Sequence, residues 1–147
     1  MAAHPRFYSP YDEVLWKSIA EGALRLQRCS DCGTYRYPPG ACCPKCLSID
    51  ATWEKVSGSG RVLSWMTYHK QYLPAYPAPT TIVAAELEEG PILITNIDHG
   101  ETASLSIDRP VRIIYGDHPD GYRIPRFTLA GDAAPPGSRP DRSVADR

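Results

Sequence analysis

The sequence predicts a mainly β protein, in which a short N-terminal helix and a cysteine-rich ribbon precede a small barrel of five strands. Three observations lead to this fold class. One stretch near the start has helical periodicity, all five cysteines lie between residues 29 and 46, and five strand-like segments follow residue 60. Fifteen prolines among the 147 residues also argue against long helices. A hydrophobic content of 42% is sufficient for a core.

The helix is expected over residues 9–22. Ser9 can serve as its N-cap and Gly22 is a natural stop. Its apolar positions recur every four residues, at Tyr11, Leu15 and Ile19. The following segment, ALRLQRC (23–29), alternates apolar and polar residues, which predicts a strand leading into the first cysteine.

Five further strands are expected after residue 60, separated by Gly, Pro and Asp: RVLSWMTYH, TIVAAELE, PILITNI, PVRIIYG and GYRIPRFTL. Without helix-length segments among them, they favour a small barrel such as an OB-fold. A sandwich of two small sheets is the alternative. We therefore divide the chain into an N-terminal arm and helix (1–22), a ribbon (23–59), a barrel (60–130) and a disordered tail (131–147).

The cysteines form two C-x2-C pairs with 10 residues between them: Cys29, Cys32, Cys43 and Cys46. Four thiolates in this arrangement are typical of a tetrahedral structural zinc site. Using Cys42 in place of Cys43 would give C-x3-C spacing and misplace the following proline, so Cys42 is expected to be a spare thiol. A metal-free loop and an iron site remain alternatives. Iron would imply electron transfer, and because no second redox centre is visible, we favour zinc.

The chain has a formal net charge of −1 and contains no apolar stretch of the roughly 18 residues that span a membrane. Its N-terminus shows no apolar run typical of a secretory signal. We therefore expect a cytoplasmic protein, and in that reducing compartment clustered cysteines favour metal over disulfides.

The order of these motifs resembles domain-of-unknown-function family 35, proteins that combine a rubredoxin-like zinc ribbon with an OB-fold. The resemblance runs from about residue 8 to residue 129. It is carried by GALRLQRCSDCG, the aromatic-Pro-Pro segment, CPKC, the SGSGRVLSW segment that begins the barrel, and RIPRFTL near its end. The sequence departs from the family pattern at IDRPV (107–111), where a glycine is common, and at Cys42.

The resemblance implies a non-catalytic accessory subunit. Members of this family typically bind thiolase-fold enzymes that act on acyl-CoA esters, such as thiolases, synthases and retro-aldolases, or hydratase-like subunits. They bridge or complete the partner and help to hold acyl-CoA. We therefore expect Zn²⁺ as a structural cofactor, an enzyme partner, and no catalysis by this chain alone.

The best candidate contact surface is the aromatic, proline-rich segment that follows the first barrel strand. Its proposed partner-binding residues are Tyr68, His69, Tyr72, Leu73 and Tyr76. Tyrosines offer contact area together with a hydrogen bond, and prolines reduce the entropy lost on docking. The remaining histidines, His4, His99 and His118, lie in the N-terminal arm or in turn-like segments, where we expect them to be solvated.

Single-stranded nucleic acid is the alternative ligand, because OB-folds and zinc ribbons both occur in nucleic-acid-binding proteins. Residues 60–130 carry six basic and eight acidic side chains, a formal net charge of −2, which disfavours this function. A local basic patch of Arg112, Arg123 and Arg126 remains conceivable, and it could equally attract the phosphates of CoA.

Overall fold

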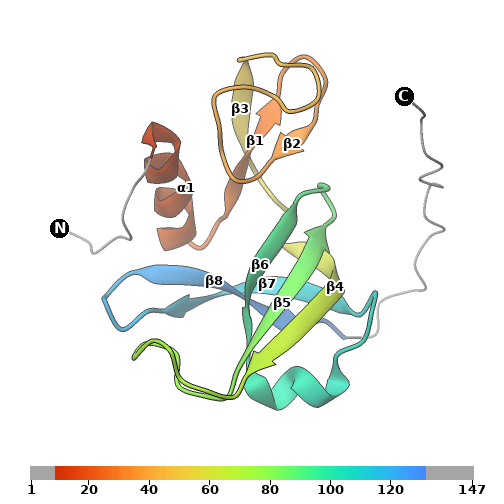
Figure 1. Cartoon of the computed structure of the whole chain (residues 1–147). Coiled ribbons are helices and arrows are strands. Elements are labelled where there is room, and N and C mark those ends of the chain that lie inside the picture. Colours follow the sequence, from red (N-terminus) through yellow and green to blue (C-terminus); the bar gives the residue numbers. More distant parts are fainter. Residues whose placement is uncertain (1–8, 132–147) are drawn as a thin grey trace.

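The computed structural model describes residues 9–131 of the chain. Figure 1 shows a small three-stranded sheet above a barrel, with helix α1 (Pro10–Ala20) beside both. The expectations for the N-terminal arm, for His4 and for residues 132–147 of the tail lie outside the described residues. Among the described residues, no helix is long and apolar enough to cross a membrane.

Helix α1 confirms the predicted N-terminal helix. Its N-cap is Ser9, whose backbone N–H donates to Asp12 Oδ2 at 2.8 Å. Leu15 and Ile19 are buried, as their spacing predicts. Gly22, just beyond the helix, has φ +70°, a conformation that glycine adopts at low cost.

The cysteine-rich region forms an antiparallel sheet with the strand order β2-β1-β3. Its strands are β1 (Arg25–Cys29), β2 (Tyr35–Arg36) and β3 (Ala51–Lys55). The sequence analysis predicted β1, but it missed β3. The β3 segment has no buried residue, and its apolar and polar residues do not alternate cleanly, so the sequence carries no local signal for a strand. It is a strand because it pairs with β1.

The second half of the chain is a closed barrel with the strand order β4-β5-β6-β8-β7. Its strands are β4 (Ser59–Tyr68), β5 (Thr80–Leu87), β6 (Ile92–Ile97), β7 (Pro110–Asp117) and β8 (Arg123–Leu129). All five predicted strands are confirmed, and the two-sheet alternative is wrong because the sheet closes on itself. A 3₁₀ helix, η1 (His99–Ser104), connects β6 to β7. The barrel closes at a single parallel pair, Ile97 with Phe127.

One apolar core joins the helix, the ribbon and the barrel. Its buried members include Leu15, Ile19, Leu24, Leu26, Val56, Val62, Val83, Val111 and Phe127. The Leu24 N–H also donates to Tyr115 Oη in β7 at 2.7 Å, which ties the start of the ribbon to the barrel. Gly60 lies where β4 crosses between β5 and β7, and a Cβ there would come within 2.7 Å of the Glu86 carbonyl oxygen. Only glycine fits this close approach.

One sequence-based expectation about the loops is wrong. His118 is buried rather than solvated, with 7% of its surface exposed, because aromatic rings pack on it. At the turn between β5 and β6, the Glu89 carboxylate accepts a hydrogen bond from the Ser57 N–H. That contact holds the segment between ribbon and barrel against the β5–β6 turn.

Candidate metal centre and interaction surface

The two C-x2-C pairs adopt the same backbone turn. In each turn, the N–H four residues after the first cysteine donates to the carbonyl of that cysteine at 2.9 Å: Gly33 to Cys29, and Leu47 to Cys43. Gly33 and Leu47 both have positive φ, at 71° and 63°. Glycine adopts this conformation at low cost, whereas for a leucine it is unfavourable.

The turns bring four sulfur atoms together. The thiol groups of Cys29, Cys32, Cys43 and Cys46 all lie within 4.8 Å of one another. Two cross-pair distances, Cys29 Sγ to Cys46 Sγ and Cys32 Sγ to Cys43 Sγ, are 3.5 Å. Tetrahedral zinc with Zn–S bonds of about 2.3 Å separates its sulfurs by roughly 3.8 Å, so this spacing suits such an ion. Cys42 is exposed and stands outside the cluster.

Local hydrogen bonds prepare some of these thiols for deprotonation. The Thr34 hydroxyl, 3.1 Å from Cys32 Sγ, and the Thr34 backbone lower the pKa of Cys32 to about 6. For Cys46 the Ser48 backbone lowers the pKa, but the neighbouring Cys29 and Cys32 sulfurs outweigh it and raise the value to about 12. Four crowded sulfurs cannot all ionise unaided, and a bound cation removes that obstacle.

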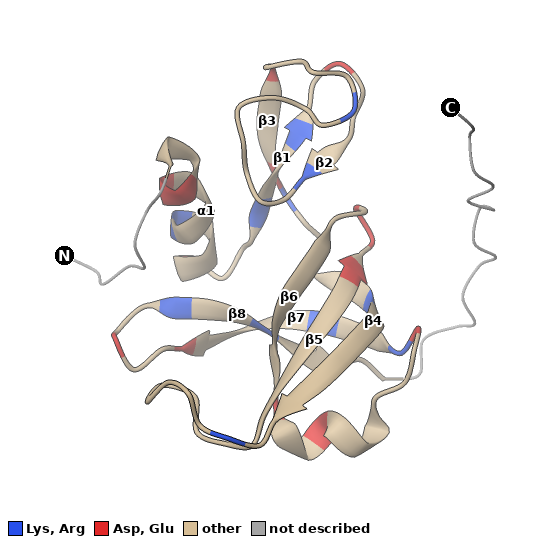
Figure 2. Ribbon diagram, viewed as in Figure 1, with Lys and Arg blue, Asp and Glu red and all other residues tan. Residues whose placement is uncertain are grey.

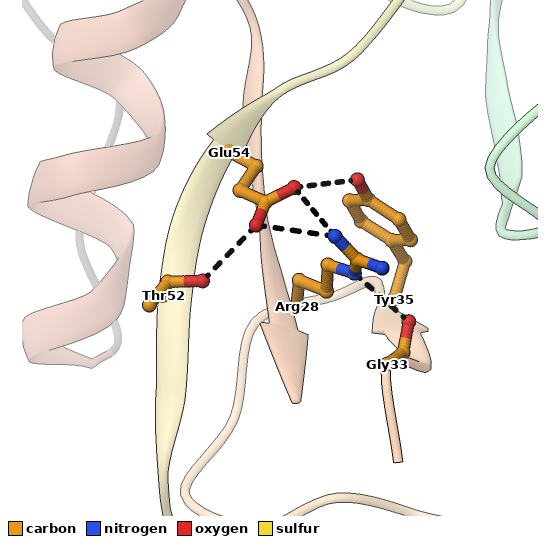
Figure 3. A network of polar contacts seen from close by, with 5 residues as sticks. All are labelled: Arg28, Gly33, Tyr35, Thr52 and Glu54. Carbon is orange, nitrogen blue, oxygen red and sulfur yellow. Dashed lines mark hydrogen bonds and ion pairs between the residues drawn. The ribbon is translucent and has the colours of Figure 1, made fainter. Parts of the chain in front are cut away.

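A polar network braces the first cysteine turn against the sheet (Figure 3). Glu54 Oε2 accepts from Tyr35 Oη at 2.9 Å and from Arg28 Nη1 at 3.4 Å. Arg28 Nε donates to the Gly33 carbonyl at 3.4 Å, so the network reaches the turn itself. The Tyr35 hydrogen bond, followed by the charge of Arg28, holds the pKa of Glu54 below its usual value.

Two buried side chains support the loop that leads to the second cysteine pair. Gln27 Oε1 accepts from the Gly40 N–H at 2.8 Å, and Arg36 Nη1 donates to the Gly40 carbonyl at 3.2 Å. Gln27 and Arg36 face each other across β1 and β2 and are each 4% exposed. The sheet thus fixes the position from which the chain turns back to Cys43.

The predicted partner-binding segment folds over the outer face of the barrel and forms an apolar groove of ≈600 Å³. Its lining comprises Tyr68, Lys70, Tyr72, Leu73, Tyr76, Thr80, Ile82, Ile94, Thr95 and Asn96. Four of the five predicted contact residues therefore lie at one site. His69 is exposed but is not part of the lining.

The sequence analysis missed the strand residues that form the floor of the groove. Ile82 on β5 and Ile94 on β6 line it, and Ile94 is 65% exposed. The available signal was the alternation along β5, where Thr81, Val83 and Ala85 are buried and the intervening residues face outward. Above the floor, Tyr72 is 70% exposed and packs edge-on against Tyr68.

A row of aromatic rings connects the groove to helix α1. The Tyr76 ring lies 5.6 Å from the His118 ring, which stacks on Tyr122 at 4.4 Å. Tyr122 in turn meets Trp16 of α1 edge-on at 6.0 Å. Trp16 and Trp53 pack against the core, whereas Trp65 is 38% exposed. The β4–β5 loop is thereby anchored through Tyr76.

A ribbon with four clustered thiols, packed on a closed five-stranded barrel, defines a protein of the zinc-ribbon and OB-fold class. Two family descriptions match the chain: "ChsH2, rubredoxin-like zinc ribbon domain" over residues 16–49 and "ChsH2, C-terminal OB-fold domain" over residues 53–115. The chain belongs to this family of DUF35-type proteins, as the resemblance implied.

A solved structure titled "Ltp2-ChsH2(DUF35) aldolase" contains a chain of the same fold. The two chains superpose with a TM-score of 0.77 at 29% sequence identity, over 86% of this chain and 98% of that one.

Three curated proteins of known sequence are also similar. A Thermomonospora curvata protein named "Probable enoyl-CoA hydratase alpha subunit" is 36% identical over 130 residues, which cover 88% of this chain and 41% of that protein. The "3-oxo-4,17-pregnadiene-20-carboxyl-CoA hydratase alpha subunit" of Mycobacterium tuberculosis is 32% identical over 71% of this chain and 33% of its own length. A "DUF35 domain-containing scaffold protein" of Methanocaldococcus jannaschii is 36% identical over 51% of this chain and 55% of its own. The chain thus spans less than half of either hydratase subunit.

Proposed function

We propose that this protein is a non-catalytic accessory subunit that binds a thiolase-fold enzyme and helps to complete or stabilise its acyl-CoA site. The observation that carries the proposal is the match over nearly the whole chain to the DUF35 chain of an Ltp2-ChsH2 aldolase. The names of the two hydratase relatives, which both refer to CoA esters, support acyl-CoA as the substrate class of the partner.

We further propose that Cys29, Cys32, Cys43 and Cys46 hold one structural Zn²⁺. The matching zinc-ribbon description and the clustered sulfurs support this assignment. A structural zinc site supplies on the order of 10–16 kcal/mol, which a short ribbon needs because its own core is small. Such a site suits the cytoplasm, where reducing conditions keep thiols available as metal ligands.

The apolar groove is the surface that we assign to the enzyme partner. Tyr72 and Leu73 stand at its rim, 70% and 58% exposed, beside the exposed Ile94. Leaving these groups in water is unfavourable, and docking would bury them. The role of Tyr76 is to anchor the loop through His118, so the exposed pair is better suited to a docking test.

The structure lends little support to the nucleic-acid alternative. Figure 2 shows Lys and Arg interspersed with Asp and Glu over both parts of the molecule rather than gathered on one face. Arg112 pairs with Thr128 and Arg123 with Asp117, at opposite ends of the β7–β8 pair, so these two arginines do not form the patch considered from the sequence. Several loop aromatics pack on one another instead of presenting free faces to bases.

The test is co-purification of the tagged chain with proteins of its native cell. The wild type should retain a thiolase-fold enzyme, and Tyr72→Ser combined with Leu73→Ser should reduce its recovery at least tenfold. Ile107→Ser is the matched control, because Ile107 is also an exposed apolar residue (57%) but does not line the groove. Thermal melts should show that all variants remain folded. Undiminished recovery by the double variant, or a hydratase as the retained enzyme, would reject the proposal.

A further inference from the structure

A second pocket, of ≈320 Å³, lies between the β4–β5 loop, the start of η1 and the β7–β8 turn. It shares Tyr76, Thr80 and Asn96 with the apolar groove but is markedly more polar in its other residues. Its polar lining consists of Tyr76, Thr80, Asn96, Asp98, His99, Asp117, His118 and Arg126. Pockets of this size bind small molecules, and the loops beside it occupy the positions at which OB-folds take ligands.

Arg126 is the main cationic group of this pocket. Its neighbour Phe127 points into the barrel, so Arg126 lies on the outer face of β8. The side chain extends across Gly116 of β7, where a Cβ would stand 2.9 Å from Arg126 Cδ. Arg126 Nε is buried and makes no hydrogen bond to any residue that the structure describes. A buried guanidinium nitrogen without an acceptor is unfavourable, and an anionic ligand would supply that acceptor.

The carboxylates of Asp98 and Asp117, which line the pocket, and of Asp120 beside it all have other contacts. Asp98 Oδ1 accepts from the Gly100 N–H at 2.8 Å. The Asp117 side chain is 92% exposed and lies 3.9 Å from Arg123. Asp120 is 74% exposed and lies 3.6 Å from His118 Nδ1. None of these three acids forms an ion pair with Arg126 in the described part of the chain.

Three further side chains offer hydrogen-bond donors to the pocket. His118 Nδ1 accepts from the Asp120 N–H at 3.2 Å, so the proton of the neutral ring resides on Nε2, which can donate. Burial raises the pKa of Tyr76, which keeps its hydroxyl protonated and able to donate. The side-chain amide of Asn96 adds a further donor.

We propose that this pocket binds a small oxyanion, a carboxylate or a phosphate group. Arg126 provides the positive charge and its planar fork, and Tyr76, Asn96 and His118 provide hydrogen bonds. The proposal is independent of the partner enzyme. A bound anion would also connect the β4–β5 loop, which forms the rim of the apolar groove, to β8.

The test uses the full-length, zinc-loaded protein. It is titrated with inorganic phosphate and, separately, with succinate at constant ionic strength, and binding is followed by calorimetry and by the NMR signals of His99 and His118. We expect saturable binding of at least one anion, with shifts of the His118 ring. Phosphate binding alone would identify a phosphate site, and succinate binding alone a carboxylate site.

Arg126→Gln should weaken that binding at least tenfold. Arg112→Gln is the matched control, because it removes the same charge from an exposed position outside the pocket lining. Arg126→Lys, which keeps the charge but loses Nε, should bind with intermediate affinity and serves if the glutamine variant misfolds. The proposal is overturned if neither anion binds saturably, or if Arg126→Gln or Arg126→Lys binds as tightly as the wild type.

Discussion

Adjacent cysteines in this chain have different surroundings. Cys43 is fully buried within the sulfur cluster, and its Sγ accepts from the Lys45 N–H at 3.4 Å. The side chain of Cys42 is exposed and outside the cluster. The spacing of the cysteines favoured Cys43 over Cys42 as the ligand. The structure gives the physical reason, because the backbone turn of the second pair begins at Cys43, whose carbonyl accepts from the Leu47 N–H.

Replacing each cysteine in turn tests the ligand assignment. Cys42→Ser should retain one zinc per chain and melt like the wild type, whereas Cys43→Ser should lose the metal and the ordered ribbon. Metal content by mass spectrometry and circular dichroism are the measurements. Equal zinc loss in both variants, or zinc retained by Cys43→Ser, would show that the ligand set is different.

Glu54 makes a pH-dependent contribution to the ribbon. Because Tyr35 and Arg28 lower its pKa, the carboxylate stabilises the fold above the unfolded-state value of about 4.3 and loses this effect as the pH falls through the folded-state pKa. Glu54→Gln should therefore destabilise the protein near neutral pH, and the difference should shrink as the pH falls below about 4.3. Urea unfolding in excess zinc measures it. A difference that is constant or grows on acidification would refute the role of Glu54.

At the scale of elements, the second cysteine turn carries backbone strain. Leu47 occupies the left-handed conformation that Gly33 occupies in the first turn, and its side chain is 74% exposed. A leucine in this conformation costs roughly 1–2 kcal/mol. Leu47→Gly should consequently stabilise the zinc-loaded protein by about 1 kcal/mol in denaturant unfolding. A loss of stability would mean that the leucine side chain makes contacts that outweigh the strain.

The regular elements could be predicted from the sequence because their signals are local. Ser9, Gly22 and the four-residue spacing of Leu15 and Ile19 define α1, and alternation defines the barrel strands. The burial of His118 could not be predicted, since it depends on Tyr76, which is distant in the sequence. The floor of the groove likewise needs strands β5 and β6 placed side by side.

In the whole molecule, the shared core makes the ribbon and the barrel one unit. The Leu24 N–H bonded to Tyr115 Oη, and Glu89 bonded to the Ser57 N–H, connect the two parts on either side of that core. The aromatic row from Trp16 to Tyr76 extends this connection to the groove. A metal that orders the ribbon would therefore also steady the surface that we assign to the partner.

The most direct measurement of the central proposal is acyl-CoA turnover by the separated and recombined components. The co-purified enzyme is assayed alone, together with this chain, and against this chain alone. We predict that the chain alone has no activity, that the enzyme alone is impaired, and that recombination restores turnover. Turnover of an acyl-CoA by the isolated chain, or a partner whose activity is indifferent to it, would contradict a non-catalytic accessory role.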